Sequence, residues 1–253
     1  PISTHRRSSA ASDVYKRQMI NYKKNFELLT KNHVYSSEME HDSCGVGFIC
    51  STEGKKSRAV VEYGIEALKA VWHRGAVDAD GKTGDGAGIH LEIPKDFFIE
   101  KIQVTGHDYD NSEICVGMIF LPRNDYSSQE SCKTIVESEL TKNNFSIYGW
   151  RQVPVNPKVL GEKALQTMPE IIQVLFKSND RNLLDKELER KIYEIRKRIE
   201  NKAFEMSLND FYICSISSKS IIYKGMFLAE AISDFYQDLK DRRFISRLSL
   251  IHI

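Results

Sequence analysis

Residues 44–50 read CGVGFIC, and residues 72–88 read WHRGAVDADGKTGDGAG. Small and apolar residues alternate in the first segment, and its valine, phenylalanine and isoleucine favour a β-strand. Residues 59–73, which lead into the second segment, carry apolar side chains at helical spacing and predict an amphipathic helix. Gly75 is a natural stop for that helix. A strand is therefore followed by a helix that ends inside the second segment.

The glycine-rich end of the second segment, GKTGDGAG at residues 81–88, predicts a tight loop. A strand follows this loop, so it lacks the helix N-terminus on which phosphate-binding loops depend. It also matches neither the G-x-G-x-x-G nor the G-x-x-x-x-G-K-[ST] pattern. Asp85 is expected to set the geometry of the loop through side-chain bonds to the backbone.

The rest of the chain mixes helices and strands. We expect strands at 89–93, 114–121, 145–153, 211–217 and 220–224, and helices at 129–142, 185–205 and 226–239. The last two strands are separated by a short Ser-Ser-Lys turn and are predicted to pair with each other. Strict β-α-β alternation is absent, so the pattern favours an α+β fold over a doubly wound sheet.

The composition is that of an ordinary globular protein. The chain has 253 residues, of which 41% are hydrophobic and 28% charged, and its formal net charge is +1. Such a charge gives no electrostatic reason to expect nucleic acid or an anionic membrane as a partner. No stretch approaches about 18 consecutive apolar residues, so no membrane-spanning helix is expected. With no visible signal peptide and an odd number of cysteines, the cytoplasm is the expected compartment.

The two ends of the chain differ from the rest. Residues 1–18 show neither helical nor strand periodicity and include SAASDVYKRQ, which is typical of translated adaptor or vector sequence. We therefore expect residues 1–18 to be an artefact and Met19 to be the true start. The final residues, LSLIHI, are either adaptor-derived or the first part of a real strand.

The five cysteines include one with a distinctive context. None of them forms a C-x-x-C pair, so neither zinc nor an iron–sulfur cluster is expected within this chain. Cys44 is preceded by Asp-Ser and followed by Gly-Val-Gly, whose glycines allow the close approach of a substrate. The residues alone leave two interpretations open, a nucleophile or a cysteine that begins a buried strand. Arg74 is similarly either a carboxylate ligand or a cap for the carbonyls of its own helix.

Taken together, these strings resemble one family. The segments that carry the resemblance are EHDSCGVGFIC (40–50), GIEALKAVWHRGAVDADGKTGDGAGIHLEIP (64–94), RQVPVNPKVLGEKALQTMPEIIQVLF (151–176) and FYICSISSKSIIYKGMFLAE (211–230). They look like the amino-terminal class II glutamine amidotransferase domain of glutamate synthase large subunits, and more like the bacterial NADPH-dependent type than the ferredoxin-dependent type. The resemblance implies an N-terminal-nucleophile hydrolase fold, a four-layer α-β-β-α sandwich of which residues 44–253 would form an incomplete part.

The resemblance also implies a mechanism. Residues 19–43 would be a propeptide, and its removal would make Cys44 the first residue of the mature chain. The thiol of Cys44 would attack the side-chain amide of glutamine, with the freed α-amine of the same residue as the base. A γ-glutamyl thioester would form and ammonia would leave. Arg74 and Gly75 match the family's Arg-Gly pair near the nucleophile and are expected to bind substrate or to support the site; no metal ligand is implied.

The family pattern implies further parts that do not occur in this chain. These are His-Gln-Arg, Ser-Thr-Asn and His-Asn-Gly-Glu segments, which would supply the α-carboxylate ligand and the oxyanion hole. Because each oxyanion donor contributes about 10²–10³ in rate, we expect the chain by itself to be inactive. The full-length protein would pass ammonia to 2-oxoglutarate in glutamate biosynthesis. It would use FMN, an iron–sulfur cluster and NADPH, and its partners would be glutamine, the downstream synthase domains and a small subunit that carries FAD.

Two other functions stay open at this point. Another class II amidotransferase, such as an asparagine or amino-sugar synthase, would share the Cys-Gly and Arg-Gly motifs. It is not expected to share the TGDGAG and YKGMFLAE strings found here. A non-catalytic glutamine-binding remnant would keep the fold but would never be cleaved between Ser43 and Cys44.

Overall fold

The computed structural model describes residues 23–28, 30–31 and 44–253. The chain separates into two units, Pro1–Ser43 and Cys44–Ile253. In the first unit, the described residues are helical. The predicted artefact at 1–18 lies outside the described residues, as does most of the predicted propeptide. The sheets and helices described below all belong to the second unit.

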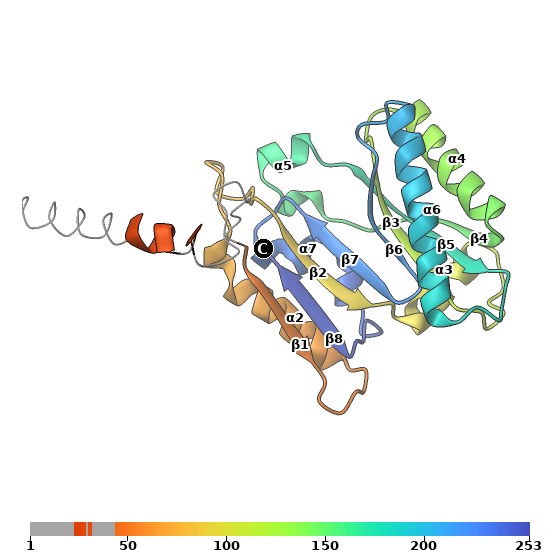
Figure 1. Cartoon of the computed structure of the whole chain (residues 1–253), viewed down its shortest axis with the longest axis horizontal. Helices are drawn as coiled ribbons and strands as arrows, with labels where there is room; N and C mark the ends of the chain where they lie inside the picture. Colours follow the sequence, from red (N-terminus) through yellow and green to blue (C-terminus); the bar gives the residue numbers. More distant parts are fainter. Residues whose placement is uncertain (1–22, 29, 32–43) are drawn as a thin grey trace, which may run out of the picture. The chain divides into compact units, whose positions relative to one another are not determined.

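The first of two antiparallel sheets contains the strand that follows Cys44. Its strand order is β1 (Val46–Cys50), β8 (Leu248–His252), β2 (Ala87–Glu92) and β7 (Ser220–Gly225). The last strand in the chain, β8, lies between β1 and β2 and pairs with both of them (Figure 1). The final residues of the chain therefore form a central strand of this sheet.

One face of the first sheet is covered and the other is open. Helix α2 (Arg58–Ala70) packs against the covered face, where Gly64 lies directly over Ser249. On the edge strand β1, the side chains that point the other way stay in solvent, and Val46 is 70% and Phe48 65% exposed. The first sheet thus combines a buried face with an exposed apolar one.

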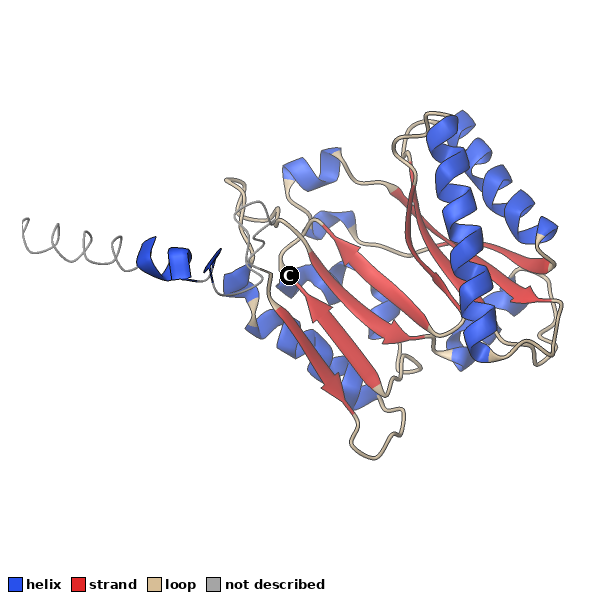
Figure 2. Ribbon diagram, in the orientation of Figure 1, coloured by secondary structure: helices blue, strands red, loops and turns tan. Residues whose placement is uncertain are grey.

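The second sheet has the order β4 (Phe145–Gln152), β5 (Glu170–Ser178), β3 (Cys115–Leu121) and β6 (Tyr212–Ser217). Two long helices, α4 (Tyr126–Lys142) and α6 (Asp185–Glu205), pack against it through a cluster of buried aliphatic side chains (Figure 2). Helix α6 coincides with the predicted surface helix and buries its narrow apolar stripe there.

The remaining helices are short. They are α3 (Lys95–Val104), α5 (Glu162–Gln166) and α7 (Ile232–Phe235), with single 3₁₀ turns at Trp72–Arg74, Pro157–Val159, Ala229–Ala231 and Gln237–Lys240. Among the helices that the structure describes, none combines the length and apolar character needed to cross a bilayer.

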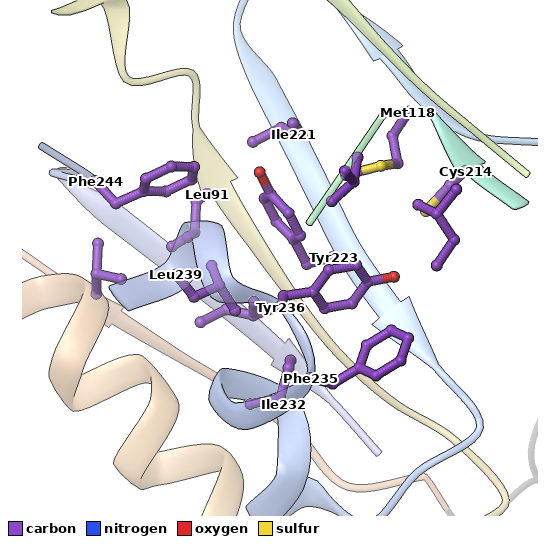
Figure 3. Packing of buried hydrophobic residues seen from close by; sticks show 14 of the residues in the cluster. Leu91, Met118, Cys214, Ile221, Tyr223, Ile232, Phe235, Tyr236, Leu239 and Phe244 are labelled. Atoms are coloured by element: carbon purple, nitrogen blue, oxygen red, sulfur yellow. The ribbon is translucent and has the colours of Figure 1, made fainter. Parts of the chain in front are cut away.

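The larger core cluster joins both sheets. Leu91 and Tyr223 from the first sheet and Met118 from the second belong to it, together with the aromatic side chains that follow β7 (Figure 3). The rings of Tyr223 and Tyr236 pack edge to face, with centroids 4.9 Å apart. A single apolar interior therefore connects the two sheets.

A charged pair is buried beside this core. Arg151 on β4 and Asp238 form a bidentate ion pair, with nitrogen–oxygen distances of 2.5 and 2.8 Å. The hydroxyl group of Tyr223 also donates to Asp238, and the side-chain oxygen of Gln173 accepts from Arg151. These bonds satisfy two charges that would be costly to bury alone.

Two predictions about local structure are wrong. The strands predicted at 211–217 and 220–224 form, but they do not pair with each other: β6 pairs with β3 in the second sheet, whereas β7 pairs with β2 in the first. The chain crosses between the sheets at this turn. The helix predicted at 226–239 is replaced by the 3₁₀ turn Ala229–Ala231, helix α7 directly after it and the 3₁₀ turn Gln237–Lys240, and extended backbone at Tyr236 (φ −90°, ψ 102°) separates α7 from the last turn.

Candidate active site

Cys44 lies at the end of the first sheet, immediately before β1. Its side chain is exposed. The next residue, Gly45, continues the pairing of β1 with the last residue of the chain: its backbone nitrogen donates to Ile253 and its carbonyl accepts from Ile253, both at 2.9 Å. Cys44 is therefore attached to a residue that the sheet holds in register.

The Arg74-Gly75 pair lies against this end of the sheet. Helix α2 ends at Ala70, and the 3₁₀ turn that follows carries the chain to Arg74 and Gly75. A Cβ atom built on Gly45 would lie 3.0 Å from Cβ of Arg74 and 2.7 Å from a methyl carbon of Ile253. A Cβ atom on Gly75 would lie 2.9 Å from the same isoleucine side chain. At both positions the neighbouring atoms lie too close to leave room for a side chain, so glycine is required. The structure places Cys44, Arg74 and Gly75 at the same end of the sheet.

A short hairpin follows Gly75. Residues 76–78 run antiparallel to residues 83–85: the nitrogen of Asp78 donates to Thr83 at 2.9 Å, and the nitrogen of Asp85 donates to Ala76 at 3.3 Å. The base of this hairpin, which we call the 76–85 hairpin, therefore carries Gly75 on one side and Asp85 on the other. A carboxylate oxygen of Asp85 lies 3.2 Å from the position that a Cβ of Gly75 would take.

The predicted role of Asp85 in setting the loop geometry belongs to a different residue. The side chain of Asp80, at the tip of the hairpin, accepts hydrogen bonds from the backbone nitrogens of Lys82 at 2.9 Å and Thr83 at 2.7 Å. The hydroxyl of Thr83 donates to the second oxygen of Asp80 at 2.6 Å. These bonds hold the pKa of the Asp80 carboxyl well below its usual range. Both aspartates follow a glycine or precede one, so composition could not separate them.

The other cysteines do not compete with Cys44 for the role of nucleophile. Burial raises the pKa of the Cys132 thiol to about 11 and that of Cys214 to about 12, and the pKa of the buried Cys115 rises further. Because the thiolate is the reactive form, these three thiols are inert near neutral pH. Cys50 is exposed but stands at the far end of β1, about 20 Å along the strand from Cys44 at about 3.3 Å per residue.

Ile253 is the residue near the site that sequence reasoning did not single out. Its side chain touches the positions of both Gly45 and Gly75. Its place could not be inferred from local pattern, because the pairing with Gly45 joins the two ends of the second unit. Within the described parts of the chain, no three His, Cys, Asp or Glu side chains lie close enough together to hold a metal ion.

Comparisons with known proteins agree with this geometry. The family model of class II glutamine amidotransferases matches residues 44–253 and begins at the candidate nucleophile. The large chain of the NADPH glutamate synthase of Azospirillum brasilense is 52% identical over 231 residues, which cover 91% of this chain and 15% of that protein. Ferredoxin-dependent glutamate synthases are less similar: that of Pyropia yezoensis is 38% identical over 89% of this chain and 15% of its own length.

These relatives are much longer than the chain described here. The match to the ferredoxin-dependent glutamate synthase 1 of Arabidopsis thaliana, at 39% identity, covers 84% of this chain but 13% of that protein. Class II glutamine amidotransferases have the N-terminal-nucleophile hydrolase fold, and the two antiparallel sheets with their helices fit an incomplete form of its sandwich. The predicted α+β class is confirmed. Because the family model covers most of the chain, the protein belongs to the class II glutamine amidotransferases.

Proposed function

We propose that residues 44–253 belong to the glutaminase domain of a glutamate synthase, and that Cys44 is its nucleophile. The observation that carries this proposal is the position of Cys44. It is exposed, it is the first residue of the second unit, and Arg74 packs against the residue that follows it. Removal of residues 19–43 as a propeptide would give Cys44 a free α-amine.

The free amine matters because the nucleophile needs a base. An α-amine has a pKa of about 7.7–8.0 and a thiol one of about 8.5, so a proton can pass between them near neutral pH. The sulfur of Cys44 then attacks the amide carbon of the glutamine side chain, and the proton goes to the departing ammonia. The resulting γ-glutamyl thioester is hydrolysed by water, which releases glutamate and restores the thiol. While Cys44 follows Ser43 in a peptide bond, its nitrogen cannot act as this base.

Arg74 and Gly75 are proposed to form one side of the substrate site. Gly75 can approach closely because it has no side chain, and it lies against the side chain of Ile253, the residue that pairs with Gly45. Arg74 lies against the position of Gly45 through its Cβ and Cγ atoms, at 3.0 and 3.1 Å. In this arrangement Arg74 supports the nucleophile, and Gly75 faces the substrate.

The full-length protein is proposed to use the released ammonia to convert 2-oxoglutarate into glutamate, in the cytoplasm. For that step we propose FMN, an iron–sulfur cluster and NADPH, with FAD on a small partner subunit. The described residues of this chain offer no cluster of side chains that fits an iron–sulfur group. In this proposal the cofactors bind to other domains of the full-length protein, and the glutamine hydrolysis described above uses none of them.

The proposal is tested in the full-length protein with Cys44→Ser and the matched control Cys50→Ser, which changes the other exposed cysteine. Cys44→Ser should reduce glutamine-dependent glutamate synthesis by about 10³-fold or more and leave ammonia-dependent synthesis unchanged. Cys50→Ser should leave both activities unchanged. The intact mass of the mature wild-type chain should correspond to a start at Cys44.

Two results would contradict the proposal. If Cys44→Ser lowered both activities equally, Cys44 would be structural rather than the nucleophile. If the wild-type chain kept the bond between Ser43 and Cys44 and showed no glutaminase activity, the domain would be a non-catalytic member of its family.

A further inference from the structure

The tip of the 76–85 hairpin is fastened from two directions. Within the hairpin, both carboxylate oxygens of Asp80 accept hydrogen bonds, from the backbone and the hydroxyl of Thr83, at 2.7 and 2.6 Å. Gly81 turns the chain with a positive φ of 69°. Thr83 is buried, with 2% of its surface exposed. A turn with these bonds is rigid, unlike the tip of an ordinary surface loop.

The second fastening comes from the start of helix α5, far away in the sequence. A Cβ atom on Gly161 would lie 2.2 Å from a carboxylate oxygen of Asp80 and 2.5 Å from the backbone nitrogen of Thr83. The backbone nitrogen of Ala164 donates to the hydroxyl of Thr83 at 3.4 Å. Lys163 forms an ion pair of 2.7 Å with Asp78, which lies in the first strand of the hairpin.

The base of the same hairpin belongs to the candidate active site. An isolated two-stranded hairpin is only marginally stable in water, so the position of this hairpin depends on its contacts with the rest of the protein. One anchor is at the base, where Gly84 packs directly against the backbone of Phe227. The other is the contact of the tip with α5, which we call the Asp80 clasp and define as Asp80, Thr83 and Gly161.

We propose that the Asp80 clasp positions the Arg74-Gly75 pair against Cys44, and that Asp80 and Thr83 are positioning residues for glutamine hydrolysis. This inference rests on the function proposed above. The side chain of Asp80 does not touch substrate. It holds the tip of the 76–85 hairpin, and Gly75 lies at the base of the same hairpin. A tip that is released from α5 lets the base shift, and a shift of about 1 Å at reacting groups costs about 10²-fold in rate.

The chain contains a matched control for this clasp. Asp125 begins helix α4 and makes the same pair of bonds to the residue three positions later: it accepts from the backbone nitrogen of Ser128 at 3.0 Å and from the hydroxyl at 2.6 Å. It lies at the second sheet, away from Cys44. Removal of either carboxylate should destabilise the protein to a similar degree, but only Asp80 is connected to the candidate site.

The experiment compares Asp80→Ala with Asp125→Ala in the full-length protein. Glutaminase kcat/KM should fall by about 10-fold or more in Asp80→Ala and stay within about 2-fold of wild type in Asp125→Ala. Ammonia-dependent synthesis should be unchanged in both. Alkylation of Cys44 by the glutamine analogue 6-diazo-5-oxo-L-norleucine should slow in Asp80→Ala, whereas alkylation by iodoacetamide, which needs no substrate site, should keep its rate.

A second pair of variants covers the case in which Asp80→Ala does not fold. Thr83→Val keeps the shape of the side chain but removes the hydroxyl that bonds to Asp80 and to Ala164. Thr83→Ser keeps that hydroxyl. Glutaminase kcat/KM should fall in Thr83→Val and be restored in Thr83→Ser, with melting temperatures that differ little between the two.

The outcomes separate this inference from the proposed function. Active wild-type protein together with unchanged glutaminase kcat/KM in Asp80→Ala or Thr83→Val overturns the role of the clasp alone. An equal loss in Asp80→Ala and Asp125→Ala, or an equal loss of glutamine-dependent and ammonia-dependent synthesis, shows a general effect on stability and also overturns it. A wild-type protein without glutaminase activity overturns the proposed function, and this inference with it.

Discussion

Replacing Gly45 by alanine tests how closely the residue after Cys44 must approach its neighbours. The new Cβ atom would lie 2.7 Å from a methyl carbon of Ile253 and 3.0 Å from Cβ of Arg74. Carbon atoms in contact are normally about 3.5–4.0 Å apart, so Gly45 must move by about 1 Å relative to these groups. A displacement of about 1 Å costs about 10²-fold in rate, which corresponds to about 2.7 kcal/mol in the activation barrier.

The assay is glutaminase kcat/KM of the full-length protein, measured beside ammonia-dependent synthesis. We expect the first to fall by about 10²-fold in Gly45→Ala and the second to be unchanged, since ammonia bypasses Cys44. The control is Gly47→Ala, two residues further along the same strand. There the added Cβ would meet the end of the flexible Ile251 side chain at 3.3 Å, which can turn aside. This variant should lose little glutaminase activity.

Two outcomes of the Gly45 experiment would refute the reasoning. Unchanged glutaminase kcat/KM in Gly45→Ala would show that the close approach to Arg74 and Ile253 is not needed for catalysis. Equal losses in Gly45→Ala and Gly47→Ala would show that the stability of the strand, rather than the approach of Gly45, controls the activity.

Three further predictions concern stability and solubility. Asp238→Ala leaves the buried charge of Arg151 without its bidentate partner and should lower the free energy of unfolding by about 3–5 kcal/mol in urea titrations; a loss below about 1 kcal/mol would contradict this. The hydrogen bond from Arg243 lowers the pKa of Asp241 to about 2 from 3.8, so the stabilisation is complete above about pH 4 and is lost as the pH falls toward 2. Arg243→Gln should therefore lose less melting temperature between pH 5 and pH 3 than wild type, and identical losses would count against the pair. Because the edge strand exposes 65% of Phe48, the chain expressed with no further sequence should be poorly soluble, and recovery of a soluble monomer with cooperative melting would contradict that expectation.

Elements with a strong local pattern could be predicted from the sequence, and their partners could not. Helix α6 begins and ends at the predicted residues because its apolar stripe repeats at helical spacing for five turns. The pairing of β6 with β7 was predicted wrongly because a short turn between two apolar strands is typical of a hairpin. Strand β5 was not predicted, because Gln173 interrupts its apolar run and its buried residues do not alternate with exposed ones.

In the candidate site, too, local motifs could be predicted from the sequence and long-range contacts could not. The motifs around Cys44 and Arg74 could be found by their resemblance to a family, and the structure places them together. The contribution of Ile253 depends on a pairing between the two ends of the second unit, which no window of sequence contains. The clasp at Asp80 was missed in favour of Asp85 because only the three-dimensional contact with Gly161 distinguishes the two aspartates.

The central place of β8 has a consequence for the order in which the protein is made. Strand β1 pairs with β8, and about 200 residues separate the two strands along the chain. While the ribosome is still producing the intervening residues, β1 has no strand to pair with, and pairing across such a distance is slow. The backbone pairing of Gly45 with Ile253 therefore cannot form on a nascent chain before Ile253 has emerged. The surroundings of Cys44 are thus completed late in the folding of the second unit, whatever the stability of the elements made before β8.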